Sequence, residues 1–243
     1  MNVVELAKYR KLFGGGGGGD FPLDKYFEGG QAEINLPNVT KIGEYIFYYN
    51  KTLVNVSMPK VTAIDNFAFY ACSNLAITEL PSGLISIGDN AFQSCNKLAL
   101  IELPIGLTSV GKQAFAACHE LALTELPSGL ISISDQAFSG CYKLALTKLP
   151  NALTTINYCV FANCTSLALT ELPSGLTSIA EYAFQSCKGL TNITFKGKPN
   201  TIKSNAFYYC TNLTTINVPW AEGEVAGAPW GATNATINYN SEV

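Results

Sequence analysis

The chain contains little of what catalysis and nucleic-acid binding require. Its 243 residues include one histidine, and Asp, Glu, Lys and Arg together make up 14% of it, against roughly 25% in typical soluble domains. No partner motif surrounds that histidine, His119, so a catalytic triad is not expected. A formal net charge of -3 argues against a nucleic-acid partner, which requires a basic face. We therefore predict a protein that is not an enzyme and does not bind nucleic acid.

Long apolar runs and cofactor motifs are also missing. No stretch approaches the roughly 18 apolar residues of a membrane span. The basic residues Lys8, Arg10 and Lys11 follow the first apolar residues, whereas a secretory signal has its basic residues first. Neither a membrane span nor a secretory signal is therefore predicted in this sequence.

Motifs that bind phosphates or metals are missing as well. The glycine run at 14–19 lacks the G-x-G-x-x-G spacing of a phosphate loop, and neither a calcium loop nor a zinc-ligand cluster is present. No metal or cofactor is predicted.

Cysteine, by contrast, recurs at a fixed period. Seven of the eight cysteines end the motif Ala-Phe-x-x-Cys, or Val-Phe-x-x-Cys in one copy, and successive members are 23 residues apart. These residues are Cys72, Cys95, Cys118, Cys141, Cys164, Cys187 and Cys210. A fixed period in this range is typical of a solenoid, in which each repeat forms one turn stacked on its neighbours.

The periodic cysteines are predicted to be free thiols. Equivalent residues of stacked turns lie about 4.8 Å apart, and their Cβ atoms point the same way. Their Cβ separation therefore exceeds the mean of about 3.8 Å in a disulfide. We expect a ladder of buried thiols that pack as small apolar groups. Cys159 stands outside this ladder and is expected to be another packed thiol or, alternatively, a reactive one.

One repeat, which begins at Leu98, indicates how each turn folds. Leu98, Ile101 and Leu103 have the spacing L-x-x-L-x-L, which predicts a short strand with these side chains inward. Pro104 ends the strand because it has no N–H to donate. A second short extended stretch follows. Residues 112–118 are predicted to form one or two helical turns with Phe and Cys inward.

Four segments are predicted along the chain. Residues 1–19 combine a short peptide with a glycine linker, and residues 20–33 form an N-terminal cap. About eight repeats of 22–23 residues fill 34–219. Residues 220–243 form a C-terminal cap, with both tryptophans and a final strand at 236–239, because an open solenoid end exposes its core.

The candidate binding residues lie on the first strand of each repeat. If Ile101 and Leu103 face inward, Leu100 and Glu102 face outward, and the repeats align these positions into two stripes. The apolar stripe consists of Ile77, Leu100, Leu123, Leu146 and Leu169, and the charged stripe of Glu79, Glu102, Glu125, Lys148 and Glu171. An apolar patch on the strand face of a solenoid is typical of a protein-binding surface.

A different register of the same strand is the alternative. Threonine replaces the expected inward isoleucine at Thr78, Thr124, Thr147 and Thr170. A slip of one residue would turn the leucine row into the core and the threonine row toward solvent, because strand side chains alternate between faces. The sequence leaves both registers open.

The unit L-x-x-I-x-L-P-x-x-L-x-x-I-G-x-x-A-F-x-x-C resembles the BspA-type, or treponemal-class, leucine-rich repeat. Residues 98–118 match it position by position, and the likeness covers about residues 31–219. The resemblance implies an α/β repeat fold. This fold is a curved right-handed solenoid with short parallel strands on one face and short helical turns on the other.

The resemblance also implies a function. Proteins of this class are commonly surface or secreted proteins that act in adhesion and protein binding, so we expect a non-catalytic module with a protein or cell-surface ligand. Residues 1–13, followed by glycines, resemble the start of prophage structural proteins. The alternative is therefore a structural or receptor-binding component of a phage particle, assembled through that peptide. The sequence leaves the location open, and the resemblance favours the cell surface, the extracellular space or a virion.

Overall fold

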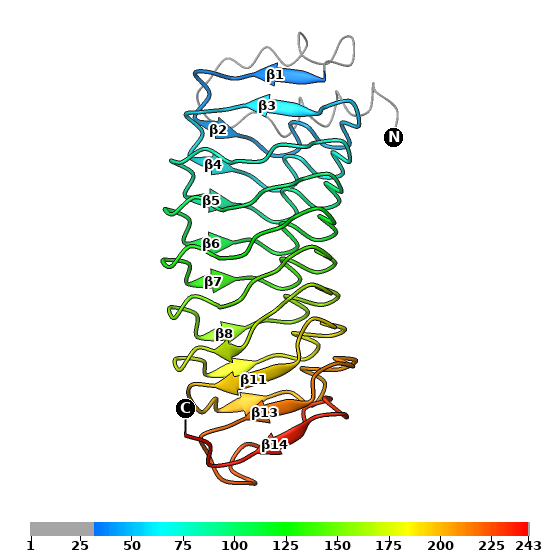
Figure 1. The fold of residues 1–243 in the computed structure, drawn as a ribbon. Coiled ribbons are helices and arrows are strands. Elements are labelled where there is room, and N and C mark those ends of the chain that lie inside the picture. Colours follow the sequence, from blue (N-terminus) through cyan, green and yellow to red (C-terminus); the bar gives the residue numbers. More distant parts are fainter. Residues whose placement is uncertain (1–31, 243) are drawn as a thin grey trace.

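The structure, a computed structural model, describes residues 32–242, which form a right-handed solenoid of about nine turns. The turns stack in chain order, so that β1 (Glu33–Asn35) and β14 (Thr236–Asn238) lie at opposite ends of the molecule (Figure 1). All strand pairs are parallel. The predicted solenoid is confirmed. The predicted peptide at 1–13, on which the phage alternative rests, and most of the predicted N-terminal cap lie outside the described residues.

The second extended stretch of each turn forms a nearly continuous ladder. Its two-residue strands end in a buried isoleucine or valine, and such β-branched side chains suit a half-buried pleated surface. The register places Ile87 beside Ile64 and Val110. One sheet contains β2 (Lys41–Ile42), β4 (Ala63–Ile64), β5 (Ser86–Ile87), β6 (Ser109–Val110) and β7 (Ser132–Ile133), and another contains β8 (Thr155–Ile156), β10 (Ser178–Ile179) and β12 (Thr201–Ile202).

The first extended stretch of each turn forms strands only toward the two ends of the solenoid. β1 pairs with β3 (Asn55–Ser57), and a second sheet has the order β14, β13 (Thr215–Asn217), β11 (Asn192–Phe195) and β9 (Glu171–Leu172). Between β3 and β9, the equivalent stretches of four described turns contain no strand. These four stretches are residues 75–80, 98–103, 121–126 and 144–149.

Helices are absent from residues 32–242, so the predicted helical turns are wrong. In one repeat, Gln113 (φ 53°) and Ala117 (φ 58°) have left-handed backbone, which a right-handed helix cannot include. The N–H of Phe115 donates to the backbone oxygen of Ala137 in the next turn (2.8 Å), whereas the N–H of Cys118 donates to Phe115 (3.1 Å). The bond within the turn reverses the chain direction, and the bond to Ala137 joins this turn to the next one.

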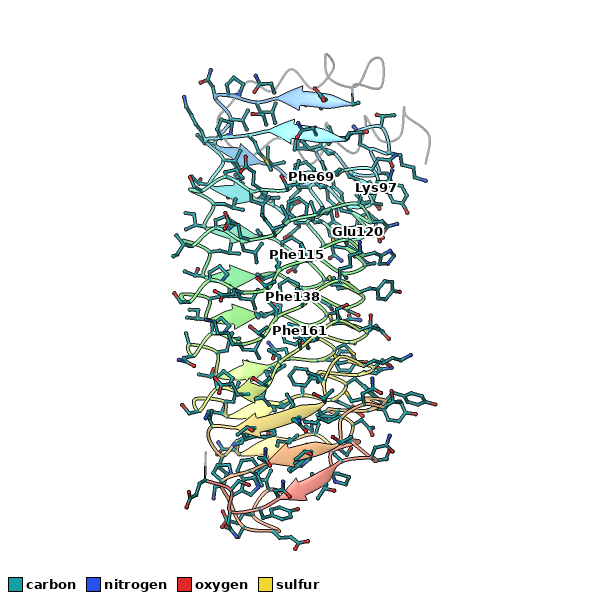
Figure 2. All side chains as sticks on the ribbon, viewed as in Figure 1. Phe69, Lys97, Phe115, Glu120, Phe138 and Phe161 are labelled. Carbon is teal, nitrogen blue, oxygen red and sulfur yellow. The ribbon has the colours of Figure 1, made fainter. Side chains whose placement is uncertain are left out.

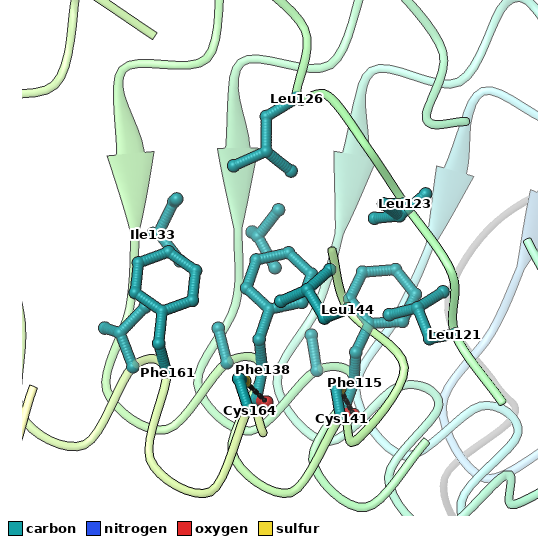
Figure 3. Close-up of a cluster of buried hydrophobic side chains, with 14 of the residues drawn as sticks. Phe115, Leu121, Leu123, Leu126, Ile133, Phe138, Cys141, Leu144, Phe161 and Cys164 are labelled. Carbon is teal, nitrogen blue, oxygen red and sulfur yellow. Dashed lines mark hydrogen bonds between the residues drawn. The ribbon is translucent and has the colours of Figure 1, made fainter. Parts of the chain in front are cut away.

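Phenylalanine and cysteine form two rows through the interior; Figure 2 shows the phenylalanine row, and Figure 3 shows members of both rows. The ring of Phe115 stacks between those of Phe92 and Phe138, with centroid distances of 5.4 and 5.5 Å. The Sγ of Cys141 donates to the backbone oxygen of Phe115 at 3.1 Å (Figure 3), and the other periodic cysteines make the equivalent contact. All eight cysteines are free and buried. The predicted thiol ladder is confirmed, and Cys159 is a packed thiol.

Both tryptophans lie in the core of the last turns. Trp230 is fully buried, and its Nε1 donates to the backbone oxygen of Ala226 at 2.8 Å. Trp220 packs edge-on against Phe195, with their ring centroids 5.3 Å apart. Strand β14 follows them and confirms the predicted final strand. These side chains extend the buried core into the last turns, while the predicted cap and the predicted segment boundaries stay predictions.

Candidate functional site

The apolar row expected on the strand face lies in the core. The exposed fractions of its side chains are 6% for Ile77, 0% for Leu100, Leu123 and Leu146, and 1% for Leu169. Ile101, which was expected to face inward, is 65% exposed. The register with the leucines outward is therefore wrong, and the alternative, with leucine inward and threonine outward, is confirmed.

Two spacings of buried side chains distinguish the turns. In residues 53–58 the first, fourth and sixth side chains are buried, so the last three follow the alternation of a strand. In residues 98–103 the first, third and sixth are buried. Ile101 and Glu102 are thus consecutive outward-facing residues, which a regular strand does not allow. The four turns without a strand share this slipped spacing; residues 167–172 have it too, but there β9 pairs with the regularly spaced β11.

The slipped spacing also interrupts the backbone ladder. Near the end of the solenoid, the N–H of Thr194 donates to the backbone oxygen of Thr170 at 2.9 Å. At the equivalent place in the middle turns, Glu102 forms no backbone hydrogen bond within residues 32–242, and neither do Ile101 and Leu103. Backbone polar groups without a protein partner require water or a ligand. This part of the face therefore has open hydrogen-bonding groups.

A groove runs along the solenoid over the interrupted ladder. It has a volume of about 1370 Å³ and extends from Asn55 in β3 to Glu171 in β9. Its lining includes the outward-facing residues of the first stretch and the prolines that follow them. The prolines are Pro59, Pro81, Pro104, Pro127 and Pro150. The groove therefore covers the turns in which the strands are missing.

Carboxylates dominate the charge of the groove. All five members of the predicted charged stripe line it and are exposed: Glu79, Glu102, Glu125, Lys148 and Glu171. Lys148 Nζ lies 3.3 Å from Glu125 Oε1. Glu79 and Glu102 have no ion-pair partner among residues 32–242. Among the described residues, the groove lining carries four negative charges and one positive charge.

Two isoleucines give the groove an apolar element that the sequence did not predict. Ile101 is 65% exposed and Ile105 is 81% exposed, and both line the groove. Exposed aliphatic side chains inside a groove can pack against a ligand, and their burial on binding is favourable. Ile101 therefore replaces Leu100 as a candidate contact residue.

The sequence does contain a signal for this register, in the residue types at the third and fourth positions of the first extended stretch. In the five repeats of the leucine row, the third position of the stretch is always Ile or Leu, whereas the fourth is Thr in all but Ile101. A core position favours apolar side chains over hydroxyls, whose burial requires a hydrogen-bond partner. The uniformly apolar position is the buried one.

The other candidate groups show no catalytic arrangement. The ring of His119 stacks on Tyr142, with centroids 4.6 Å apart. Burial raises the pKa of the Cys118 thiol well above its ordinary value, and burial also raises the pKa of the Cys159 thiol, so neither supplies a thiolate near neutral pH. Within residues 32–242, no group of three or more His, Cys, Asp or Glu is placed to hold a metal ion. The same residues include no helix that could span a membrane.

Comparison with known protein families identifies the repeat. The family described as "BspA type Leucine rich repeat region" matches residues 25–145 and 110–224, in six copies. No curated protein matches the sequence.

Solved structures with the same fold are bacterial leucine-rich repeat proteins. One from Bacteroides ovatus has a TM-score of 0.62 at 23% identity, over 86% of this chain and 69% of that one. A leucine rich cell surface protein from Faecalibacterium prausnitzii has a TM-score of 0.54 at 27% identity, over 79% of this chain and 61% of that one. One from Eubacterium ventriosum has a TM-score of 0.52 at 20% identity, over 85% and 65%. The chain matches about two thirds of each of these proteins.

Proposed function

Since the chain belongs to the BspA-type leucine-rich repeat family, whose members are repeat scaffolds and generally not enzymes, we propose that it is a non-catalytic protein-binding module. Its ligand lies in the groove, against the charged stripe and the exposed side chains of Ile101 and Ile105. The similar Faecalibacterium protein is described as a cell surface protein. That description supports a location at a cell surface, where such a module would act in adhesion.

The size and openness of the groove carry this proposal. Its volume of about 1370 Å³ exceeds the roughly 300–1,000 Å³ of typical small-molecule pockets. It extends across several turns and is lined by exposed side chains. A long open groove of this kind suits a macromolecule better than a small metabolite.

Selection of ligands from a random peptide library tests the proposal. The complete chain is the bait, and each selected peptide is then measured against a variant with Ile101→Arg and Thr124→Arg. Both residues are exposed and line the groove, so the substitutions obstruct it without entering the core. We expect the selected peptides to lose binding to this variant.

A matched variant on another part of the surface is the control. Ile85 and Thr108 are exposed and lie outside the groove lining, so Ile85→Arg with Thr108→Arg introduces the same charge elsewhere. Binding that survives the control and fails in the groove variant supports the proposal. Peptides that bind the groove variant as well as the wild type would show that the ligand site lies elsewhere.

A further inference from the structure

The charge, open backbone groups and length of the groove define the chemistry of its ligand. We infer that the groove binds an extended polypeptide segment that carries several lysine or arginine side chains. The inference rests on the proposed function and assigns its class of partner.

The first reason is the charge of the lining residues. Glu79 and Glu102 are exposed and have no ion-pair partner within residues 32–242. The groove's one lysine, Lys148, pairs with Glu125 while both side chains are more than 60% exposed. Exposed pairs of this kind contribute little stability, so a ligand cation can replace Lys148. The same negative charge disfavours nucleic acids and acidic peptides.

The second reason is the open backbone of two of the middle turns. The backbone groups of residues 78–80 and 101–103 form no hydrogen bonds within residues 32–242, and these residues line the groove. An extended polypeptide presents free N–H and C=O groups at each residue, so it can supply partners for these open groups. A folded domain offers few free backbone groups, since its own secondary structure uses them.

The third reason is length. The groove spans the turns from Asn55 to Glu171, which are five turn-to-turn steps of about 4.8 Å, or roughly 24 Å. An extended chain covers this distance with about seven residues. Ile101 and Ile105 supply an apolar surface for the alkyl stems of lysine or arginine, whose charged ends then reach the glutamates.

Fluorescence anisotropy with defined peptides tests the inference on the complete chain. The probe is a labelled octapeptide of alternating lysine and threonine, compared with one of alternating glutamate and threonine. A third peptide has the lysine sequence but N-methylated threonine amides, which keep the charge and remove backbone donors. We expect binding of the first, weaker binding of the third, and none of the second. Lys148→Glu is expected to tighten binding of the lysine peptide.

Two double variants, each of which removes two negative charges, locate the peptide-binding site. Glu79→Gln with Glu102→Gln removes the two unpaired carboxylates of the groove, and we expect about tenfold weaker binding of the lysine peptide, since charge-assisted contacts are lost. Glu222→Gln with Glu242→Gln alters two exposed residues outside the groove, and we expect no change.

Three results would overturn the inference. They are no binding of the lysine peptide, equal loss in both double variants, or equal binding of the N-methylated peptide. The failure of this inference is distinguishable from that of the proposed function. Library peptides that need the groove but lack lysine and arginine would refute the cationic ligand and leave the protein-binding groove intact.

Discussion

Leu100 and Ile101 are adjacent in the chain, yet Leu100 is fully buried and Ile101 is 65% exposed. Leu100 packs in the continuous core, whereas Ile101 lines the groove. The pair marks the point at which the first extended stretch departs from strand alternation. The core and the candidate binding surface therefore meet within one peptide unit.

Alanine substitutions at these two residues should have very different effects. Leu100→Ala leaves a cavity in the core and is expected to lower the free energy of unfolding by about 2–5 kcal/mol. Ile101→Ala removes a side chain from the surface and is expected to change it by less than about 0.5 kcal/mol. Urea denaturation followed by circular dichroism measures both. A larger loss for Ile101→Ala would contradict the register described above.

The left-handed positions of the turns predict a second contrast, between two glycines. Gly140 has φ +75°, and a Cβ atom there would strain the backbone. Gly140→Ala is expected to destabilise the protein by about 1 kcal/mol. Gly129 lies outside the left-handed region, and apart from its two chain neighbours no residue has an atom within 4 Å of the place that an added Cβ atom would occupy. Gly129→Ala is therefore expected to be neutral or slightly stabilising. Thermal denaturation of the two variants tests this, and equal midpoints would show that the turn carries no such strain.

The thiol ladder predicts a loss of stability at alkaline pH. Burial raises the pKa of the Cys118 and Cys187 thiols well above the ordinary value, and that of Cys210 to about 12. In the unfolded chain these thiols ionise near pH 8.5. The folded state keeps them protonated, so the stabilisation is full below about pH 8.5 and decreases above it, by up to about 1.4 kcal/mol per thiol and pH unit.

Removal of two ladder thiols provides the control for the alkaline transition. Cys118→Ala with Cys141→Ala lowers the stability near neutral pH, but its free energy of unfolding should fall less steeply above about pH 8.5. The variant keeps every other side chain, so the difference in slope isolates the two thiols. Parallel pH profiles for the variant and the wild type would exclude this explanation.

Much of the fold was predictable because the period of the sequence is the period of the structure. The 23-residue spacing of the cysteines indicated a solenoid with Phe and Cys rows, and each row is present in the core. The argument that stacked cysteines lie too far apart for disulfides also held for the whole ladder, whose thiols are all free. The final strand followed from the need to close the end of the array.

The two wrong predictions, the helical turns and the register of the first extended stretch, concern features that the local sequence does not indicate clearly. Left-handed backbone usually falls on glycine or asparagine, but Gln113 and Ala117 adopt it here, because bonds to the next turn hold them in place. Their sequence therefore gave no sign that the expected helical turns are absent. The register of the first stretch was ambiguous because Leu100 and Ile101 are both apolar. The register decides which side chains and backbone groups line the groove. Its ion pairs and open backbone groups were therefore not predictable either.

Amide hydrogen exchange at Glu102 and Thr194 tests the central claim most directly. These residues occupy equivalent places in their turns, but only Thr194 donates its backbone N–H to the preceding turn. In the free protein, we expect fast exchange at Glu102 and slow exchange at Thr194. Addition of the lysine–threonine octapeptide should slow exchange at Glu102 and leave Thr194 unchanged. Slow exchange at Glu102 in the free protein, or no change with the peptide bound, would contradict an open groove that pairs with an extended ligand.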